Sequence, residues 1–237
     1  SATSAPFTVT ATSGTTYTNF NSPIPVIMVN TGSKNFPSCP VANETASKHA
    51  DEMKIKLSVD VKILHNGSIV YDRKARIAYR GSSSLNFQKN SYAFCPGDAN
   101  CGDKDKGEDY VKTAKLNMLG VGKACDKDWV LYAAAADPSL MRNRLMFDTF
   151  RDMTGGWSVN SRYVELYVDG EYKGVYVMMD KVTKNEDRVN ITDPNGFIVK
   201  FDKTDLVDRY EADGDKKTFK SLYSGYDGES GNGMKTY

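Results

Sequence analysis

The segment that most constrains the fold runs from Asp137 to Met153, where the sequence predicts one long helix. We expect Asp137 to be the N-cap and Pro138 the first helical residue, because an aspartate accepts amide hydrogen bonds there and a proline has no amide to lose. Gly155 and Gly156 are expected to end the helix. Since apolar side chains surround it, we expect the helix to be buried against another layer. These side chains are Leu140, Met141, Leu145, Met146, Phe147 and Phe150.

Two polar residues, Arg142 and Asn143, lie in the first turns of this expected buried helix. A buried polar group that lacks a partner costs free energy, so both side chains need one. The segment is therefore predicted to be either a structural network or half of a binding site.

Strand patterns flank the helix on both sides. Asn66-Gly67 and Asp169-Gly170 each lie between two β-type runs and predict two hairpins. The order of strands, helix and strands predicts an α+β fold, in which one main helix packs on a mostly antiparallel sheet. The hairpin runs span residues 54–64, 68–79, 163–168 and 172–179, and further strands are expected at residues 24–29, 91–94 and 196–201.

The composition argues against some function classes. The 237 residues include 31 basic and 30 acidic ones, so the net charge is +1. This balance argues against binding to nucleic acid or to an anionic membrane through bulk charge. No apolar run approaches the length of a membrane span. The chain begins at Ser1 without a methionine, as expected of a processed mature form or of a chain freed from a tag.

Cysteines and glycosylation sequons indicate an oxidising compartment. Cys95 and Cys101 flank a short loop that a disulfide could close, and Cys39 and Cys125 could form a second bridge, although the sequence does not determine the connectivity. Together these features predict a secreted or cell-surface protein. The candidate glycosylation sites are Asn43, Asn66 and Asn190.

No metal site is predicted. The chain has two histidines and no CxxC pair, so its cysteines are not typical of a zinc site. Residues 103–105 carry two aspartates, as a calcium loop would, but Gly107 occupies a position that needs an acidic ligand.

The turn Arg80-Gly81-Ser82-Ser83-Ser84 follows an expected strand, and Lys89 comes shortly after it. A glycine and serines in such a turn can present amides and hydroxyls to an anion, while the arginine and lysine supply positive charge. The alternative is a tight turn with two surface cations.

Three motifs occur in order between residues 50 and 201. They are the Arg80 turn with Lys89-Asn90-Ser91-Tyr92, Trp129-Val130-Leu131 followed by Asp137-Pro138-Ser139-Leu140-Met141-Arg142-Asn143, and residues 164–176. Together, and in this order, they resemble the CotH family of spore-coat and secreted proteins. The family looks like an atypical, secretory-type protein kinase that transfers phosphate from ATP to serine in extracellular or coat proteins.

The resemblance implies the N-terminal lobe of a kinase, in which the Arg80 turn approaches the phosphates and Lys89 neutralises them. The helix would be the regulatory helix of that lobe, and Met178-Met179-Asp180 the hinge strand beside the adenine. Asp180 stands where the family usually has glutamate, so its carboxylate reaches less far. A scaffold network at the helix and plain core packing for the methionines are the alternatives. The implied nucleotide-binding residues are Arg80, Gly81, Ser82, Ser83, Lys89, Arg142, Asn143 and Asp180.

Phosphoryl transfer needs acidic residues that hold Mg²⁺ and accept the proton of the substrate hydroxyl. In this family they come from a second lobe with a Pro-Trp-Asp-x-Asp motif, whereas Trp129 and Trp157 precede that region here and no Pro-Trp pair occurs. Asp202, Asp205 and Asp208 are interpreted as a solvated loop. We therefore expect no catalytic residue and no phosphotransfer in this chain. ATP with Mg²⁺ or Mn²⁺ is expected to bind only where the second lobe is present.

Three segments are predicted: a linker or irregular edge over residues 1–22, the CotH-like lobe over residues 23–201, and a polar, loop-rich tail over residues 202–237. The predicted function is that of the N-lobe portion of a secreted kinase, with an extracellular or coat protein as substrate or assembly partner. The alternative is an extracellular structural or adhesive module without catalysis. A third candidate, a carbohydrate-binding domain, depends on the aromatic residues Tyr223, Tyr226 and Tyr237.

Overall fold

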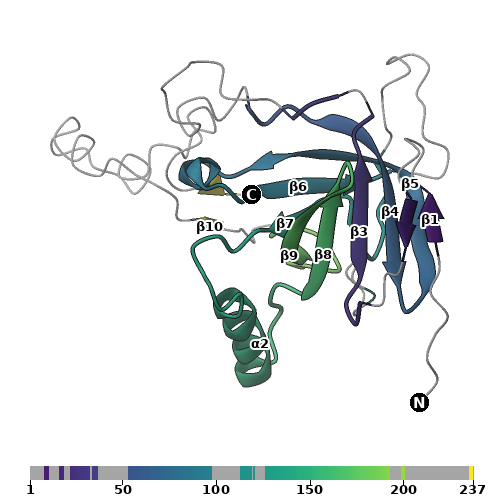
Figure 1. Ribbon diagram of the computed structural model, residues 1–237. Helices are drawn as coiled ribbons and strands as arrows, with labels where there is room; N and C mark the ends of the chain where they lie inside the picture. The colour runs from purple at the N-terminus through teal and green to yellow at the C-terminus, as the bar shows by residue number, and fades with distance from the viewer. Residues whose placement is uncertain are drawn as a thin grey trace, which may run out of the picture. The chain divides into compact units, whose positions relative to one another are not determined.

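The computed structural model describes residues 8–10, 16–18, 22–32, 34–36, 53–97, 113–118, 120, 126–192, 199–200 and 235–236. The chain divides into two compact units, Ser1–Val182 and Thr183–Tyr237. The first unit holds a β-barrel and one long helix (Figure 1).

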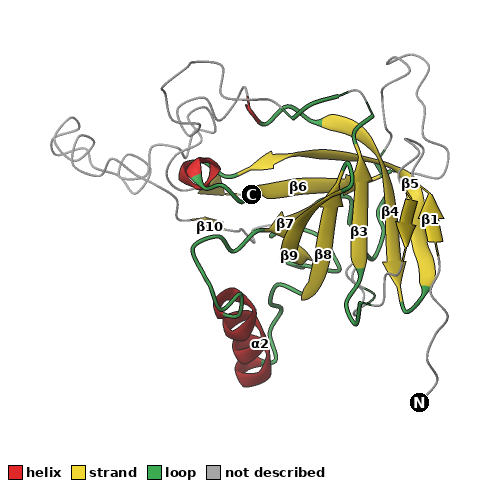
Figure 2. Ribbon diagram, in the orientation of Figure 1, coloured by secondary structure: helices red, strands yellow, loops and turns green. Residues whose placement is uncertain are grey.

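Seven strands of the first unit form a closed barrel in the order β3-β4-β5-β6-β7-β9-β8. Neighbouring strands are antiparallel except β3 and β8, which run parallel and close the ring. Figure 2 shows this ring of strands, with the helix outside it. The strands are β3 (Val26–Asn30), β4 (Leu57–His65), β5 (Ser68–Arg80), β6 (Ser91–Pro96), β7 (Trp129–Tyr132), β8 (Ser161–Val168) and β9 (Glu171–Asp180).

The barrel interior is filled by apolar side chains that alternate along the strands. On β4, Val59, Val61 and Ile63 are buried, whereas Asp60 between them is exposed. This alternation is what a closed sheet requires, because every second side chain points into the ring. The largest fully buried apolar side chains of the interior are Trp129, Tyr176, Phe94, Ile27, Ile77, Leu131, Leu166, Met178 and Val59.

Both predicted hairpins are confirmed. Strands β4 and β5 are joined at Asn66 and Gly67, with φ of 52° and 74°, and strands β8 and β9 at Asp169 and Gly170, with φ of 49° and 86°. Positive φ at both central residues gives a turn whose twist matches that of the flanking strands. The strands predicted around residues 24–29 and 91–94 are also present, as β3 and β6.

The main helix, α2 (Arg142–Thr154), differs from its prediction in where it begins and in its burial. It begins four residues after Pro138, because Leu140 has a φ of 58°, which a right-handed helix excludes. Its predicted end is confirmed, since Gly155 is left-handed and its amide donates to the Arg151 carbonyl. None of its residues is buried, and it exposes Leu145, Met146, Phe150 and Met153.

The predicted α+β fold with a packed helix is therefore wrong. The chain forms a closed seven-stranded barrel instead of a kinase-type sheet covered by a helix. A barrel buries its inner face against itself and needs no second layer. Two polar residues of α2 contact the rest of the unit. Arg151 donates to the Val159 carbonyl at 3.0 Å, and Arg144 lies 4.8 Å from the Tyr163 ring centroid.

The remaining described elements are short. A 3-10 helix, η2 (Ser83–Asn86), lies between β5 and β6, and β1 (Thr8–Thr10) pairs with β2 (Thr16–Thr18). In the second unit, β10 (Val199–Lys200) pairs with β11 (Lys235–Thr236), where a strand over residues 196–201 was predicted. Within the described ranges, no helix is long and apolar enough to cross a membrane.

Several predicted features lie outside the described residues. They are Cys39, Cys101, Cys125, Asn43, residues 103–105, Gly107, Asp202, Asp205, Asp208, Tyr223, Tyr226 and Tyr237.

Candidate functional site

The predicted anion-binding turn connects β5 to β6 at one end of the barrel. Gly81 has a φ of 132°, and a Cβ at this position would lie 2.0 Å from Ser84 Oγ, so the turn requires a glycine. The 3-10 helix η2 follows at once, and the buried side chain of Leu85 anchors it. Ser82 and Ser83 remain exposed on this anchored turn.

Lys89, at the other end of the same connection, contacts β9. Its ammonium donates to the Val175 carbonyl at 2.5 Å and lies 4.5 Å from the centroid of the Tyr176 ring. Gly174 lies beside this ammonium, and its φ of 96° is a left-handed backbone conformation that favours a glycine. Burial lowers the pKa of Lys89. An ammonium has three donors, so others are left for a ligand.

Arg80 supplies the second cation at this end. Burial lowers the pKa of its guanidinium, and the side chain forms no hydrogen bond or ion pair with the described part of the chain. Lys89 has no carboxylate partner among those residues either, since nearby Glu171 pairs with Lys173 at 2.6 Å. Arg80, which is exposed, comes before the two exposed serines in the chain, and the half-buried Lys89 comes after them. Neither cation has a carboxylate partner in the described part of the chain, so this connection suits an anion.

An aromatic cluster, which the sequence analysis missed, supports this end of the barrel. Tyr79 and Tyr92 are directly opposite on β5 and β6, with ring centroids 5.5 Å apart, and Phe36 lies 5.0 Å from Tyr79. Tyr92 also contacts Tyr176, whose hydroxyl donates to the Asn90 carbonyl at 3.1 Å. Burial raises the pKa of Tyr92 and of Tyr176, so both stay neutral. The sequence signal that could have revealed this cluster was the pair of tyrosines, one on each of two neighbouring strands.

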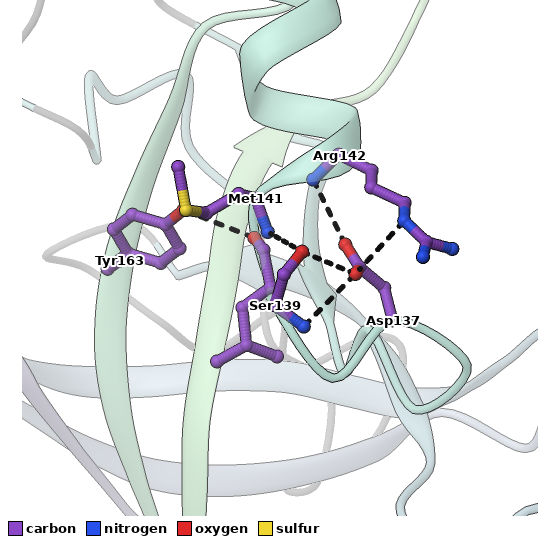
Figure 3. A network of polar contacts seen from close by, with 6 residues as sticks. Asp137, Ser139, Met141, Arg142 and Tyr163 are labelled. Atoms are coloured by element: carbon purple, nitrogen blue, oxygen red, sulfur yellow. Dashed lines mark hydrogen bonds and ion pairs between the residues drawn. The ribbon is translucent and has the colours of Figure 1, made fainter.

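The segment before α2 is a closed polar network (Figure 3). Asp137 accepts hydrogen bonds from the Ser139 hydroxyl at 2.6 Å and from the Arg142 amide at 3.0 Å, and its carboxylate lies 3.6 Å from Arg142 Nε. The hydrogen bond from Ser139 is the main cause that holds the pKa of Asp137 below its usual value. Asp137 thus accepts a helix amide as predicted, but from outside the N-cap position.

Arg142 and Asn143 are exposed at the start of α2. The guanidinium of Arg142 is held beside Asp137, and the Leu140 carbonyl accepts a hydrogen bond from the Tyr163 hydroxyl at 3.1 Å. These contacts therefore agree with the alternative that this segment is a structural network. A nucleotide contact by Arg142 or Asn143 stays a prediction.

Asp180 is the last residue of β9, whereas the Lys89 contact is at Val175 in the middle of this strand. Its buried carboxylate accepts hydrogen bonds from the Asn160 amide at 3.1 Å and from the Asn160 side chain at 2.9 Å, which orders the entry to β8. Val175 and Asp180 are five residues apart on β9, or about 16 Å along a strand. Arg80 is the last residue of β5, and Gly81, Ser82, Ser83 and Lys89 lie in the connection that follows it. Asp180 lies at a separate place, and its adenine contact stays a prediction.

Cys95 is buried and free, so the structure shows no disulfide at this residue. Its thiol donates to Asp128 at 3.3 Å, and burial raises its pKa to about 11. The candidate glycosylation sites Asn66 and Asn190 are both exposed. No cluster of three or more metal-ligating side chains occurs in the described ranges.

Comparison with known proteins identifies the family. A family model described as CotH kinase protein matches residues 77–236, more than half of the chain, and the match includes the Arg80 turn, Lys89 and α2. No curated protein matches the chain. The chain is a kinase-like protein that belongs to the CotH family.

Proposed function

We propose that this chain supplies the phosphate-binding end of a secreted CotH-type kinase, which phosphorylates serine in an extracellular or coat protein. The observation that carries the proposal is the pair of cations Arg80 and Lys89, which flank two exposed serines and have no carboxylate partner in the described part of the chain. Arginine and lysine at such a site are the side chains that bind phosphate oxygens.

The two cations have different tasks in this proposal. Lys89 is held against the Val175 carbonyl and the Tyr176 ring, so its ammonium acts as a positioned point charge. Arg80 has a planar guanidinium whose donors are not used by other described residues, so it can bind phosphate oxygens in a bidentate way. A bound Mg²⁺ or Mn²⁺ supplies further neutralisation of the phosphates.

Secretion is part of the proposal. Asn66 and Asn190 expose their side chains, as glycan acceptors must, and Asn66 lies in the tight turn between β4 and β5. Cys95 is free, so this part of the proposal depends on the two exposed sequons and not on a disulfide at Cys95.

The test is a substitution in the full-length protein that contains this chain. Lys89→Met keeps an unbranched side chain beside Tyr176 but removes the charge. We expect the affinity for ATP with Mg²⁺, measured by titration calorimetry, to fall by at least about tenfold, the loss of roughly one charge-assisted hydrogen bond.

Lys173→Met is the matched control, because Lys173 is also near this end of the barrel but is paired with Glu171. It should leave ATP affinity unchanged. If Lys89→Met binds ATP as the wild type does, the phosphate site is elsewhere and the non-catalytic module becomes the better proposal. For residues 1–237 alone we expect no thermal shift with ATP and Mg²⁺.

A further inference from the structure

Strand β5 extends beyond its neighbour β6. On one side β4 pairs with β5 along almost its whole length, whereas on the other side β6 pairs only with Ala75–Arg80. In the described part of the chain, no strand lies beside residues 68–73 on the β6 side. We call this side of residues 68–73 the open edge.

The backbone of Asp72 points to the open edge. Gly97, directly after β6, donates its amide to the Lys74 carbonyl at 3.0 Å, so the backbone groups of Lys74 face the β6 side. The backbone groups of a strand alternate between its two sides with a period of two residues, so those of Asp72 face the same side. Among the described residues Asp72 has no backbone partner there. Unpaired amides and carbonyls at a strand edge are a template for another strand.

Arg73 is a cation on the inner face of β5. Its neighbours on that face, Tyr71 and Ala75, are buried in the barrel interior, whereas Arg73 is exposed. Its guanidinium forms no hydrogen bond or ion pair with the described part of the chain. A guanidinium without a counter-charge, next to an unpaired strand edge, suits a carboxylate carried by an added strand.

A pocket of 480 Å³ adjoins the open edge and is lined by both Tyr71 and Arg73. Part of its wall is apolar and faces solvent, since Ile69 is 49% exposed and Val70 is 61% exposed. Leu116 and Met118 complete this apolar wall. Exposed apolar side chains that gather at a concave site, rather than being scattered, indicate an apolar group of a partner.

We propose that the open edge binds an extended acidic segment of another protein, which pairs antiparallel with β5 on the side where β6 pairs. Binding of this kind takes its affinity from main-chain hydrogen bonds and its specificity from alternate side chains. An aspartate or glutamate opposite Arg73 binds the guanidinium, and an apolar side chain opposite Tyr71 enters the pocket. The residue between them exchanges both backbone hydrogen bonds with Asp72.

The proposal therefore specifies a pattern, in which an acidic residue is followed two positions later by an apolar one. It is independent of the phosphate site, because Arg73 and Arg80 are seven residues apart on β5, about 23 Å along a strand.

The test uses the capped peptide acetyl-Ser-Thr-Thr-Glu-Thr-Leu-Thr-Ser-amide and the chain of residues 1–237. Fluorescence anisotropy of the labelled peptide measures its affinity, and two-dimensional NMR follows the amide signals of residues 70–73. We expect saturable binding with a shift of the Asp72 amide. Replacing the glutamate of the peptide with glutamine should weaken binding at least about tenfold, since a charge-assisted hydrogen bond is lost.

A second peptide carries proline in place of the threonine between the glutamate and the leucine. Proline has no amide to donate to the Asp72 carbonyl, so this peptide should not bind. If it binds as tightly as the first peptide, the ligand occupies the pocket without strand pairing, and the proposal is overturned.

Arg73→Gln should bind the glutamate and the glutamine peptides equally well. Lys74→Gln is the matched control, because Lys74 is the next residue on β5 but pairs with Asp60 at 3.3 Å. It should bind the glutamate peptide as the wild type does. The peptide comparisons need only the wild type, so they decide the matter even if Arg73→Gln does not fold. No saturable binding, or equal affinity of the wild type for the glutamate and glutamine peptides, would overturn the proposal.

Discussion

At the scale of single residues, His65 and Arg162 are an unusual pair because two basic side chains lie 2.7 Å apart. Burial, and then the charge of Arg162, lower the pKa of His65 below its ordinary value of 6.5. The folded protein therefore holds His65 neutral at a pH where the unfolded chain already binds a proton. Stability contributed by the neutral imidazole is complete above pH 6.5 and is lost as the pH falls toward the lowered folded pKa.

This pair gives a pH prediction. We expect the melting temperature to drop as the pH is lowered from about 7.5 to about 5. The melting temperature of His65→Gln, whose amide oxygen can still accept a hydrogen bond from Arg162, should drop less. Differential scanning calorimetry at both pH values measures the effect. Arg162→Gln should also reduce the drop, and an identical drop in all three proteins would contradict the assignment.

At the scale of elements, α2 exposes most of its apolar residues, unlike a helix that packs on a core. Arg144 and Arg151 both contact Asp148 on the inner side, at 3.5 Å and 2.9 Å, while Met146 is 66% and Met153 is 80% exposed. The sequence pattern predicted a helix that is apolar on most sides, whereas only five of the thirteen residues of α2 are apolar. It could not indicate which side would face the barrel, because that depends on the partners at Tyr163 and Val159.

The exposure of α2 gives a stability prediction. Replacing Met146 and Met153 together with glutamine should change the free energy of unfolding by less than about 0.5 kcal/mol for each position, as is usual for surface residues. As the comparison, Leu166→Ala at a residue with no exposed area should lower the free energy of unfolding by about 2–5 kcal/mol. Urea denaturation of residues 1–237 measures both, and a large loss in the double variant would show that this side of α2 is packed.

At the scale of the whole barrel, closure depends on the parallel pair β3 and β8, whose residues are far apart in the chain. Hydrogen bonds between Asp169 and Thr31, which we call the latch, lie just beyond both strands and hold this pair. Asp169 accepts hydrogen bonds from the Thr31 amide and from the Thr31 hydroxyl, both at 2.7 Å, and its own amide donates to the Val29 carbonyl at 2.8 Å. Thr31 is buried, so losing its partner leaves polar groups unsatisfied.

The latch gives the third prediction. Asp169→Ala should lower the free energy of unfolding by about 1–3 kcal/mol, because buried groups of Thr31 lose their acceptor. Asp169→Asn should lower the free energy of unfolding by less, since asparagine tolerates the positive φ and keeps one acceptor oxygen. Asp72→Ala, which breaks an exposed ion pair with Lys62, should lose no more than about 1 kcal/mol. Equal losses for Asp169→Ala and Asp72→Ala in urea denaturation would exclude the latch.

Much of the candidate site was predictable because it is local. The Arg80 turn and Lys89 lie within one connection, so the chemistry of adjacent residues placed them together. Asp180 was predicted in the same site, yet it lies at the end of β9, where it binds Asn160. Its place depends on strand register, which no local pattern contains. The aromatic cluster and the 480 Å³ pocket also arise from residues that only the barrel brings together.

The sequence by itself determined the family, both hairpins, the left-handed end of α2 and the Arg80 turn, because each depends on residues that are neighbours in the chain. Only the tertiary structure decided that the sheet closes and that α2 stays outside it. Closure pairs Val26 with Glu165 across most of the first unit, and a closed ring buries its own apolar face. That removes the need for a covering helix, so four of the apolar residues that predicted a buried helix, Met141, Leu145, Met146 and Phe150, are left exposed.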